Sequence, residues 1–390
     1  MATVRTETLQ PGATVGVLGA GQLGRMFAAA AVRMGYRVHV YAPDAVGSPA
    51  AAHAEQAHAA AWDDEAALRA FATSVDAVTL EFENVPVTAL DVVAEHAPVR
   101  PGRTALHVAQ NRGREKAFLA RIGAPTAPWR AVDDVTAAAD AARALGRPGL
   151  LKTAGFGYDG KGQAPLARPE HAGDAWNAIG GGPAVLEARL DLAYELSVVG
   201  ARGPDGRVVL YPPIRNEHDG GILDVSRLPA GVPDDVARAA QELAEAILTE
   251  LDLVGVGCTE FFVDQDGALY VNEIAPRPHN SGHLTIEAFS VSQFELQLRA
   301  LTGLPLVRPA ARASAAMANL LGDLWSAGTP AWAAALREPN LALHLYGKSE
   351  ARPGRKMGHL TALADDPRAA HERVTRARAA LGGGARTPLR

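Results

Sequence analysis

The residues best suited to chemistry lie in two stretches in the middle of the chain. The first begins at Lys152, directly after the apolar pair Leu150 and Leu151, and reads KTAGFGYDGKGQ. The second contains Asn272 and Glu273 and reads NEIAPRPHNSGH. A glycine-rich loop can bring backbone N–H groups around phosphates, and a carboxylate at a strand end can hold the Mg²⁺ that phosphates carry. Together the two stretches indicate an ATP site that lacks the usual P-loop.

Two carboxylates in this region have the spacing of a hairpin pair. Glu260 and Glu273 lie in strand-like runs on either side of a tight turn from Asp264 to Gly267. A hairpin can place both side chains on one face, where they can bridge a divalent cation. A strand-end glutamate or lysine taken alone is usually a solvated surface charge. The order of these groups, with the glycine loop between them, is what favours a site.

A second glycine pattern lies near the N-terminus. Gly19, Gly21 and Gly24 spell G-x-G-x-x-G between a predicted strand and a predicted helix, and Asp44 follows the next strand. This pattern is compatible with an NAD-dependent oxidoreductase. It is also compatible with another phosphate at the helix N-terminus, or with a tight turn that binds nothing.

Composition narrows the class of protein. The chain has 390 residues, 48% of them hydrophobic, and a formal net charge of −5. Such a balance predicts a soluble protein with real cores and argues against general nucleic-acid binding. The single cysteine, Cys258, lies in an apolar run and is expected to be a core residue. We expect no membrane span, because no apolar run is long enough, and a cytoplasmic location.

Strands that alternate with helices predict an N-terminal doubly wound parallel sheet. The middle of the chain has antiparallel strand signals mixed with helices, and the end has a smaller β-rich segment. The predicted division is a flexible tail over 1–12, a Rossmann-like domain over 13–115, a central α+β domain over 116–310, a C-terminal domain over 311–382 and a disordered tail over 383–390.

Several motifs give the chain a family resemblance. They are GVLGAGQLGRM (16–26), EFENVP (81–86), QNRGREKAFL (110–119), GYDGKGQ (157–163), NEIAPRPHNSGH (272–283), HLYGK (344–348) and RKMGH (355–359). With them the chain resembles the ATP-grasp superfamily in its three-domain ribonucleotide ligase branch, and there the 5-(carboxyamino)imidazole ribonucleotide synthase family. The resemblance implies an ATP-grasp fold and the carboxylation of the exocyclic amine of 5-aminoimidazole ribonucleotide, through carboxyphosphate, in purine biosynthesis.

The resemblance also implies roles on the nucleotide side. Phosphate contacts would come from Arg112 and Lys152, under a lid formed by Gly157, Tyr158, Asp159, Gly160, Lys161, Gly162 and Gln163. Adenine would pair with the backbone of a hinge strand made of Glu187, Ala188, Arg189 and Leu190, and Glu195 would hold the ribose, with His218 beside the nucleotide. Glu260 and Glu273 would bind Mg²⁺, or Mn²⁺, with Asn272 adjacent.

On the other side of the reaction, the resemblance implies a ribonucleotide site and a reactive centre. Backbone N–H groups of Gln22 and Leu23 would hold the substrate phosphate, with Lys348 and Arg355 as its countercharge and Glu81 near its ribose. Arg277 and His279 would face bicarbonate and the acyl phosphate, Lys152 would stabilise the transferring phosphoryl group, and Asp159 would touch the substrate amine.

The remaining expectations concern partners and alternatives. ATP is a co-substrate, and neither NAD nor biotin is expected. We expect small-molecule substrates, a homodimer, no nucleic acid or membrane, and a product passed to a separate mutase. Asn111, Ala188, Arg189 and Thr259 depart from the family pattern, although none removes a charge that the chemistry requires. The alternatives are formate-dependent glycinamide ribonucleotide transformylase, a biotin-dependent carboxylase subunit, the oxidoreductase and a non-catalytic subunit; the LYGK and RKMGH segments speak against the first two.

Overall fold

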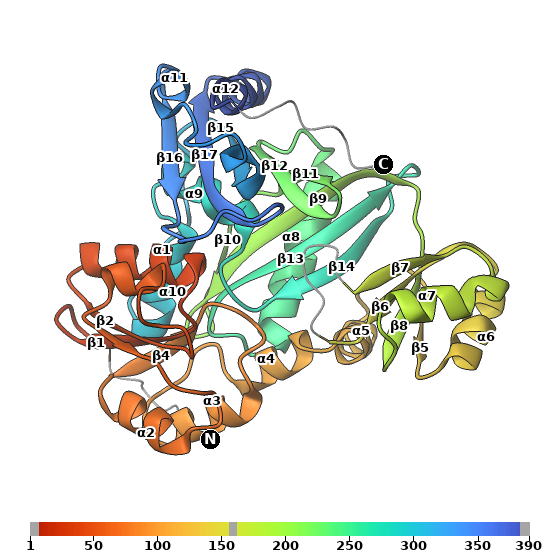
Figure 1. Cartoon of the computed structure of the whole chain (residues 1–390), viewed down its shortest axis with the longest axis horizontal. Helices are drawn as coiled ribbons and strands as arrows, with labels where there is room; N and C mark the ends of the chain where they lie inside the picture. Colours follow the sequence, from red (N-terminus) through yellow and green to blue (C-terminus); the bar gives the residue numbers. More distant parts are fainter. Residues whose placement is uncertain (1–7, 156–161, 383–390) are drawn as a thin grey trace.

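The computed structural model describes residues 8–155 and 162–382, and it confirms the mixed α/β and α+β fold class. An N-terminal lobe, coloured red to orange in Figure 1, contains a parallel four-stranded sheet with the order β3-β2-β1-β4. Its strands are β1 (Thr14–Leu18), β2 (Arg37–Tyr41), β3 (Gln56–His58) and β4 (Ala77–Leu80). The helices of this lobe are α1 (Gln22–Arg33), α2 (Glu65–Thr73) and α3 (Val87–Ala94), with a short 3₁₀ turn at Ala50–His53.

The first described residues differ from the flexible tail expected over 1–12. The N–H of Leu9 donates to the carbonyl of Thr302 at 2.9 Å, and the hydroxyl of Tyr36 donates to the carbonyl of Leu9 at 2.7 Å. Leu9 also packs against the apolar core of the lobe. The segment 8–12 is therefore tied to the molecule, whereas the rest of that tail, and the tail expected over 383–390, lie outside the described residues.

A helical connection leads from this lobe to a small second one. It consists of two helices, α4 (Arg103–Ala109) and α5 (Arg112–Arg121). Asn111 interrupts it because its side chain accepts the N–H of Arg114 at 3.0 Å, which makes it the N-cap of α5. The small lobe then forms an antiparallel sheet with the order β5-β8-β6-β7. Its elements are β5 (Trp129–Val132), α6 (Val135–Leu145), β6 (Gly149–Thr153), β7 (Gln163–Leu166), α7 (Ala172–Ala178) and β8 (Ala184–Ala188), with a 3₁₀ turn at Pro169–His171.

The centre of the molecule is a nine-stranded sheet with the order β14-β13-β9-β11-β12-β15-β17-β16, to which β10 adds at β9. The strands are β9 (Leu192–Arg202), β10 (Val208–Leu210), β11 (Ile214–Asp219), β12 (Ile222–Leu228), β13 (Gly255–Asp264), β14 (Leu269–Ala275), β15 (Ser314–Leu321), β16 (Leu341–Leu345) and β17 (Lys356–Ala364). Helices α8 (Asp234–Glu250), α10 (Gln293–Thr302) and α12 (Pro367–Ala380) pack on it, and the short elements are η3 (Asn280–Leu284), α9 (Thr285–Ala288), a 3₁₀ turn at Gly322–Trp325 and α11 (Trp332–Ala335).

The C-terminal strands share this sheet with the central domain. Val225 of β12 pairs with Ala318 of β15, and the pairing continues to Leu228 opposite Ala315. In Figure 1 the blue strands β15 and β17 continue the green strands β11 and β12. The boundary expected at 310/311 therefore separates two parts of one hydrogen-bonded sheet. No helix of the described residues is long and apolar enough to cross a bilayer.

Candidate active site

Two carboxylates meet across the β13–β14 hairpin. Glu260 pairs directly with Glu273 in the register of the two strands, and a bulge follows Glu260. Directly opposite residues point to the same face of a sheet, so the predicted hairpin pair is confirmed. Nε2 of His279 lies 2.9 Å from Oε1 of Glu260, and Nη1 of Arg112 lies 3.2 Å from Oε2 of Glu273. Each carboxylate therefore has its own cationic neighbour.

This pair fits a cation that brings other ligands with it. Within residues 8–155 and 162–382, no group of three or more His, Cys, Asp and Glu side chains is arranged to hold a metal by itself. Mg²⁺ commonly binds one or two carboxylates together with substrate phosphates and water. Burial alone would raise the pKa of Glu260, but His279 outweighs it and lowers that pKa to about 2. Glu260 is thus an anion at neutral pH, as a metal ligand must be.

Lys152 at the end of β6 is part of a buried ionic cluster. Its Nζ donates to Oε2 of Glu187 at 2.8 Å, and Nζ of Lys116 lies 3.5 Å from Oε1 of the same carboxylate. Burial opposes the charge on Glu187, yet the two lysines lower its pKa to about 2. Lys116 also donates to the carbonyl of Asn272 at 2.9 Å. The cluster joins the small lobe to β14 beside Glu273.

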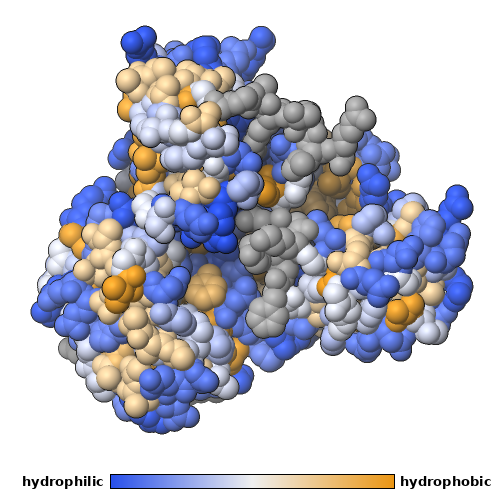
Figure 2. Space-filling view, viewed as in Figure 1, coloured by the Kyte–Doolittle hydropathy of each residue, from blue (hydrophilic) through white to orange (hydrophobic). Residues whose placement is uncertain are grey.

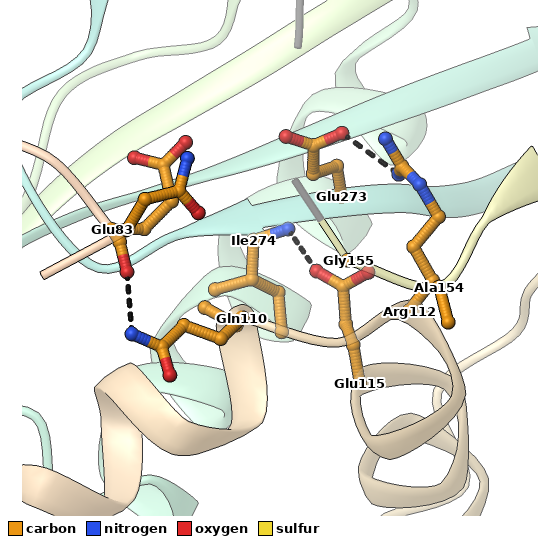
Figure 3. A pocket seen from close by; sticks show the side chains of 10 residues that line it. Glu83, Gln110, Arg112, Glu115, Ala154, Gly155, Glu273 and Ile274 are labelled. Carbon is orange, nitrogen blue, oxygen red and sulfur yellow. Dashed lines mark hydrogen bonds and ion pairs between the residues drawn. The ribbon is translucent and has the colours of Figure 1, made fainter. Parts of the chain in front are cut away.

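A pocket lies between α5, the start of the glycine loop and β14 (Figure 3). Arg112 and Glu273 form an ion pair on one side of it, and Oε1 of Glu115 accepts the N–H of Ile274 at 2.6 Å on the other. Gln110 donates to the carbonyl of Glu83 at 2.8 Å. The pocket therefore joins the connection between the lobes to the carboxylate hairpin. The space-filling view of Figure 2 shows the surface hollowed where the lobes meet.

The predicted hinge and ribose residues also come close to the site. Nδ1 of His218 lies 3.0 Å from Oε2 of Glu195, so these two side chains from β11 and β9 are a pair. In the hinge, the N–H of Ala188 donates to the carbonyl of Pro128 at 2.7 Å, and that of Arg189 to the carbonyl of Pro148 at 2.9 Å. The N–H groups of Ala188 and Arg189 are therefore bonded within the protein. Leu190 is the hinge residue whose N–H has no partner among the described residues.

The lid falls largely outside the described residues, which omit Gly157, Tyr158, Asp159, Gly160 and Lys161. Gly162 has φ +68°, and a Cβ there would lie 2.6 Å from the hydroxyl of Thr153, so glycine is required at the end of the loop. Gln163 was expected in the lid but is the first residue of β7, where it pairs with Lys152.

Arg277 follows the carboxylate hairpin and is held by the N-terminal lobe. Its Nε donates to Oε2 of Glu83, and its Nη1 donates to the carbonyl of Pro278 at 3.2 Å. Burial disfavours the guanidinium charge, but Glu83 outweighs this and raises the pKa of Arg277. The ion pair thereby connects the end of β4 to the segment that carries His279.

The N-terminal glycine pattern surrounds a carboxylate. The N–H groups of Gly21 and Gly24 donate to Glu81, the second at 2.8 Å. A Cβ at Gly19 would lie 2.3 Å from Cγ of Glu81, and one at Gly21 would lie 2.6 Å from its Oε1. The glycines are thus explained by the close approach of Glu81, which takes the place where a dinucleotide pyrophosphate would bind. The N–H groups of Gln22 and Leu23 have no partner among the described residues and remain available to a ligand.

The two cations expected at the C-terminal end of the site lie around the β16–β17 connection. Nζ of Lys348 donates to the carbonyl of Lys356 at 2.7 Å and lies 5.7 Å from the centre of the Tyr346 ring. Nη1 of Arg355 donates to the carbonyl of Glu350 at 2.9 Å. Gly347 lies next to the guanidinium of Arg25 on α1, so this connection reaches the glycine turn.

Comparison with known proteins identifies the family. Three family models match in order: the ribonucleotide synthetase preATP-grasp domain over 12–110, the ATP-grasp domain over 117–294 and the phosphoribosylaminoimidazole carboxylase C-terminal domain over 315–373. The N5-carboxyaminoimidazole ribonucleotide synthase of Brucella melitensis is 47% identical over 358 residues, which cover 91% of this chain and 98% of the relative. The chain belongs to the N5-carboxyaminoimidazole ribonucleotide synthase family. It is therefore an ATP-dependent ligase with an ATP-grasp domain.

Other members of this synthase family agree. The Bacillus subtilis synthase is 38% identical over 359 residues, covering 91% of this chain and 92% of the relative. The structure of a synthetase bound to ADP superposes with a TM-score of 0.91 at 36% identity, covering 96% of this chain and 98% of that one. The Aspergillus clavatus synthase bound to ADP and 5-aminoimidazole ribonucleotide has a TM-score of 0.86 at 31% identity, covering 96% and 99%.

Sequence reasoning assigned no role to three residues that hold this site together. They are Glu83, Glu115 and Lys116, which contact Arg277, Ile274 and Glu187 respectively. Glu83 lies in the EFENVP motif, and the other two lie in QNRGREKAFL. Both motifs supported the family resemblance, but none of these three residues was given a role from it. No local signal marked Glu115 and Lys116, because five of the ten residues of α5 are charged; their burial, at 2% and 1% exposed, appears only in the folded chain.

Proposed function

We propose that this chain catalyses the ATP- and bicarbonate-dependent carboxylation of the exocyclic amine of 5-aminoimidazole ribonucleotide, the reaction that its family name describes. The observation that carries the proposal is the pairing of Glu260 with Glu273 beside Arg112, in a chain that matches synthases over nearly its whole length. A relative of the same fold binds ADP together with 5-aminoimidazole ribonucleotide. The product belongs to purine biosynthesis.

On the nucleotide side, the triphosphate would lie over the pocket lined by Arg112, Gly155 and Glu273. Glu260 and Glu273 would hold Mg²⁺, or Mn²⁺, which would neutralise charge on the phosphate oxygens. Lys152 would contact the transferring phosphoryl group after exchanging part of its contact with Glu187. The ribose hydroxyls would bond to Glu195, and adenine would bond to the free N–H of Leu190.

On the acceptor side, bicarbonate oxygen attacks the γ-phosphorus of ATP, the bond to the ADP oxygen breaks, and carboxyphosphate forms. Arg277 and His279 would bind this anion, since Nε2 of His279 contacts Glu260 and Arg277 lies in the segment directly after β14. The exocyclic amine then attacks the carboxyl carbon, phosphate leaves and the amine loses a proton. Carboxyphosphate hydrolyses readily, so the site must exclude water, which is the role proposed for the loop that includes Asp159.

The ribonucleotide would bind where α1 meets the C-terminal strands. Its phosphate would accept the N–H groups of Gln22 and Leu23 at the positive end of the α1 dipole. Lys348 and Arg355 would supply countercharge, and Glu81 would accept a ribose hydroxyl. We also propose that the enzyme is a cytoplasmic homodimer that passes its product to a separate mutase. Sedimentation of the purified protein tests whether it is a dimer.

The decisive experiment measures ADP release with bicarbonate, in the presence and absence of 5-aminoimidazole ribonucleotide. We expect carboxylated product in step with ADP when all substrates are present. Lys348→Ala should raise the KM for the ribonucleotide about tenfold or more and leave the KM for ATP within about twofold, because one charged contact to phosphate is worth about 1.4 kcal/mol or more. Arg143→Ala, on the exposed face of α6, is the control. Loss of ATP binding in Lys348→Ala would contradict the assignment of the two sites.

A further inference from the structure

A continuous chain of polar side chains crosses the interior of the central sheet and ends at His279. The Ser226 hydroxyl donates to Oδ1 of Asn216 at 2.8 Å, and Nδ2 of Asn216 donates to the hydroxyl of Ser197 at 3.0 Å. Ser197 in turn donates to the hydroxyl of Ser281 at 2.7 Å. The Ser281 oxygen lies 2.9 Å from Nδ1 of His279, so each member contacts the next.

This polar chain lies almost completely inside the protein. Ser197, Ser226 and Ser281 are 0% exposed and Asn216 is 5% exposed. A buried hydroxyl or amide is costly unless it is hydrogen-bonded, so the members must be placed accurately to satisfy one another. They come from β12, β11, β9 and η3, elements separated by as much as 84 residues in sequence between Ser197 and Ser281. Apolar residues would fill the same volume without the desolvation cost of buried polar groups, so the presence of these polar side chains indicates a function for them.

The chain and the proposed metal carboxylates occupy one face of the sheet. Asn216 pairs with Ser226 across β11 and β12, while Ser197 pairs with Glu260 across β9 and β13. Because Glu260 also pairs with Glu273, the row runs from the buried serines to the reactive edge. His279 bridges its two ends, with Nδ1 toward Ser281 and Nε2 toward Oε1 of Glu260 at 2.9 Å.

The backbone around His279 is fixed by other buried groups. Its N–H donates to Oε1 of Gln293 at 2.9 Å, and Nε2 of Gln293 donates to its carbonyl at 2.7 Å. Asn280 exchanges side-chain hydrogen bonds with Asn319 of β15 at 3.1 and 2.8 Å. With the backbone fixed, the remaining freedom of His279 is the rotation of its ring. On the side away from Glu260 the ring meets Ser281, whose hydroxyl and backbone N–H lie 2.9 and 3.3 Å from Nδ1, and the thiol of Cys258.

We propose that Ser281, supported by Ser197, Asn216 and Ser226, is a positioning residue that fixes the orientation of the His279 ring, so that Nε2 faces the bicarbonate and carboxyphosphate site. Nε2 would thereby be available to the bound anion, while Nδ1, on the other side of the ring, keeps its contact with Ser281. This inference rests on the proposed function, in which His279 binds the reacting anion.

The test is a double-mutant cycle on ADP release and product formation. Ser281→Ala should lower kcat about tenfold, as loss of a group that orients a reactive side chain typically does, while the KM for ATP stays within about twofold. His279→Gln alone should lower kcat about a hundredfold. In the His279→Gln background, Ser281→Ala should change kcat by less than about twofold, because the ring through which Ser281 acts is gone.

A matched control separates this role from stability. Tyr36→Phe removes a hydrogen bond of another buried side chain, from the tyrosine hydroxyl to the carbonyl of Leu9 at 2.7 Å, in the N-terminal lobe and outside the polar chain. It should lower the melting temperature as Ser281→Ala does and leave kcat unchanged. Should Ser281→Ala fail to fold, Ser197→Ala replaces it, with an expected loss in kcat of about threefold that again disappears without His279.

Two results would overturn the proposal, and they are distinguishable. A tenfold effect of Ser281→Ala that persists in the His279→Gln background would show that Ser281 acts independently of the ring, and the proposed function would stand. Unchanged kcat in His279→Gln alone would remove both the role of His279 in the proposed function and the positioning role built on it.

Discussion

Glu260 and Glu273 are direct cross-strand partners on β13 and β14, and each already has a cationic side chain beside it. His279 compensates the first carboxylate and Arg112 the second. Like charges placed directly opposite each other are otherwise destabilising. A metal held by these carboxylates would compete with His279 and Arg112, and both are groups proposed to contact the substrate anions.

The first prediction concerns the carboxylate of that pair that carries Arg112. Glu273→Gln removes the charge proposed to hold the metal and leaves the β-hairpin intact, so the rate of ADP release should fall about a thousandfold. Circular dichroism should be unchanged. Glu245→Gln, on the exposed side of α8, is the control. Near-normal ADP release in Glu273→Gln would remove the metal assignment.

The second prediction tests Glu83, which holds Arg277 from the neighbouring lobe. Glu83→Gln keeps the backbone carbonyl that accepts from Gln110 and removes only the carboxylate. We expect the KM for bicarbonate to rise about tenfold, since a guanidinium that loses its charged partner is no longer held in one place. Steady-state kinetics with varied bicarbonate measure this. A KM for bicarbonate equal to that of the wild type would show that Arg277 needs no such partner.

The third prediction tests the account of the N-terminal glycines. Gly21 precedes α1 with φ −82°, a value that alanine adopts freely, but its Cβ would lie 2.6 Å from Oε1 of Glu81. Gly21→Ala should displace this carboxylate and raise the KM for the ribonucleotide about tenfold, with the KM for ATP unchanged. Gly102→Ala is a matched control: this glycine precedes α4 with φ −79° and has open space around its Cβ position. Equal kinetics for both variants would contradict the role of Glu81.

The fourth prediction concerns pH and stability. Burial raises the pKa of Glu115 from its ordinary value of 4.5 to about 8. The folded protein therefore holds a proton that the unfolded chain releases, and this contribution to stability is complete below about pH 4.5 and is lost as the pH rises through about 8. Glu115→Gln keeps an acceptor for the N–H of Ile274 and cannot ionise.

We accordingly expect the Glu115→Gln variant and the wild type to have similar melting temperatures near pH 5. At pH 8.5 the variant should melt at least ~3 °C higher, about the shift that 1 kcal/mol produces in a chain of this size. Thermal denaturation without nucleotide, at several pH values, measures the difference. A constant difference from pH 5 to pH 8.5 would contradict a raised pKa for Glu115.

Much of the architecture followed from local patterns in the sequence. The parallel N-terminal sheet and the β13–β14 hairpin were predicted from alternating strands and helices and from the turn at Asp264 to Gly267, and both are confirmed. Such features depend on neighbours along the chain. The pairing of β12 with β15 was not predicted, because their paired residues are more than 85 positions apart and neither strand carries a signal for the other.

In the site, too, local motifs predicted which residues are present, whereas contacts between residues distant in sequence were not predicted. The motifs located the charged residues, but the partner of Arg277 lies 194 residues earlier at Glu83, and that of Lys152 lies on another strand at Glu187. Nor did the sequence show that Ala188 and Arg189 donate their amides to the carbonyls of two prolines. A backbone N–H without a partner, such as that of Leu190, can be recognised only after the hydrogen bonds of its neighbours are known from the folded structure.

The sharing of one sheet by the central and C-terminal segments limits how this enzyme can be recombined with its relatives. A chimera joined near residue 310 would place β15 from one parent against β12 from the other, and the contact from Val225 to Leu228 would have to match in side-chain volume as well as in backbone. The small lobe, with its separate sheet of β5 to β8, is the part that can be exchanged with the fewest such constraints.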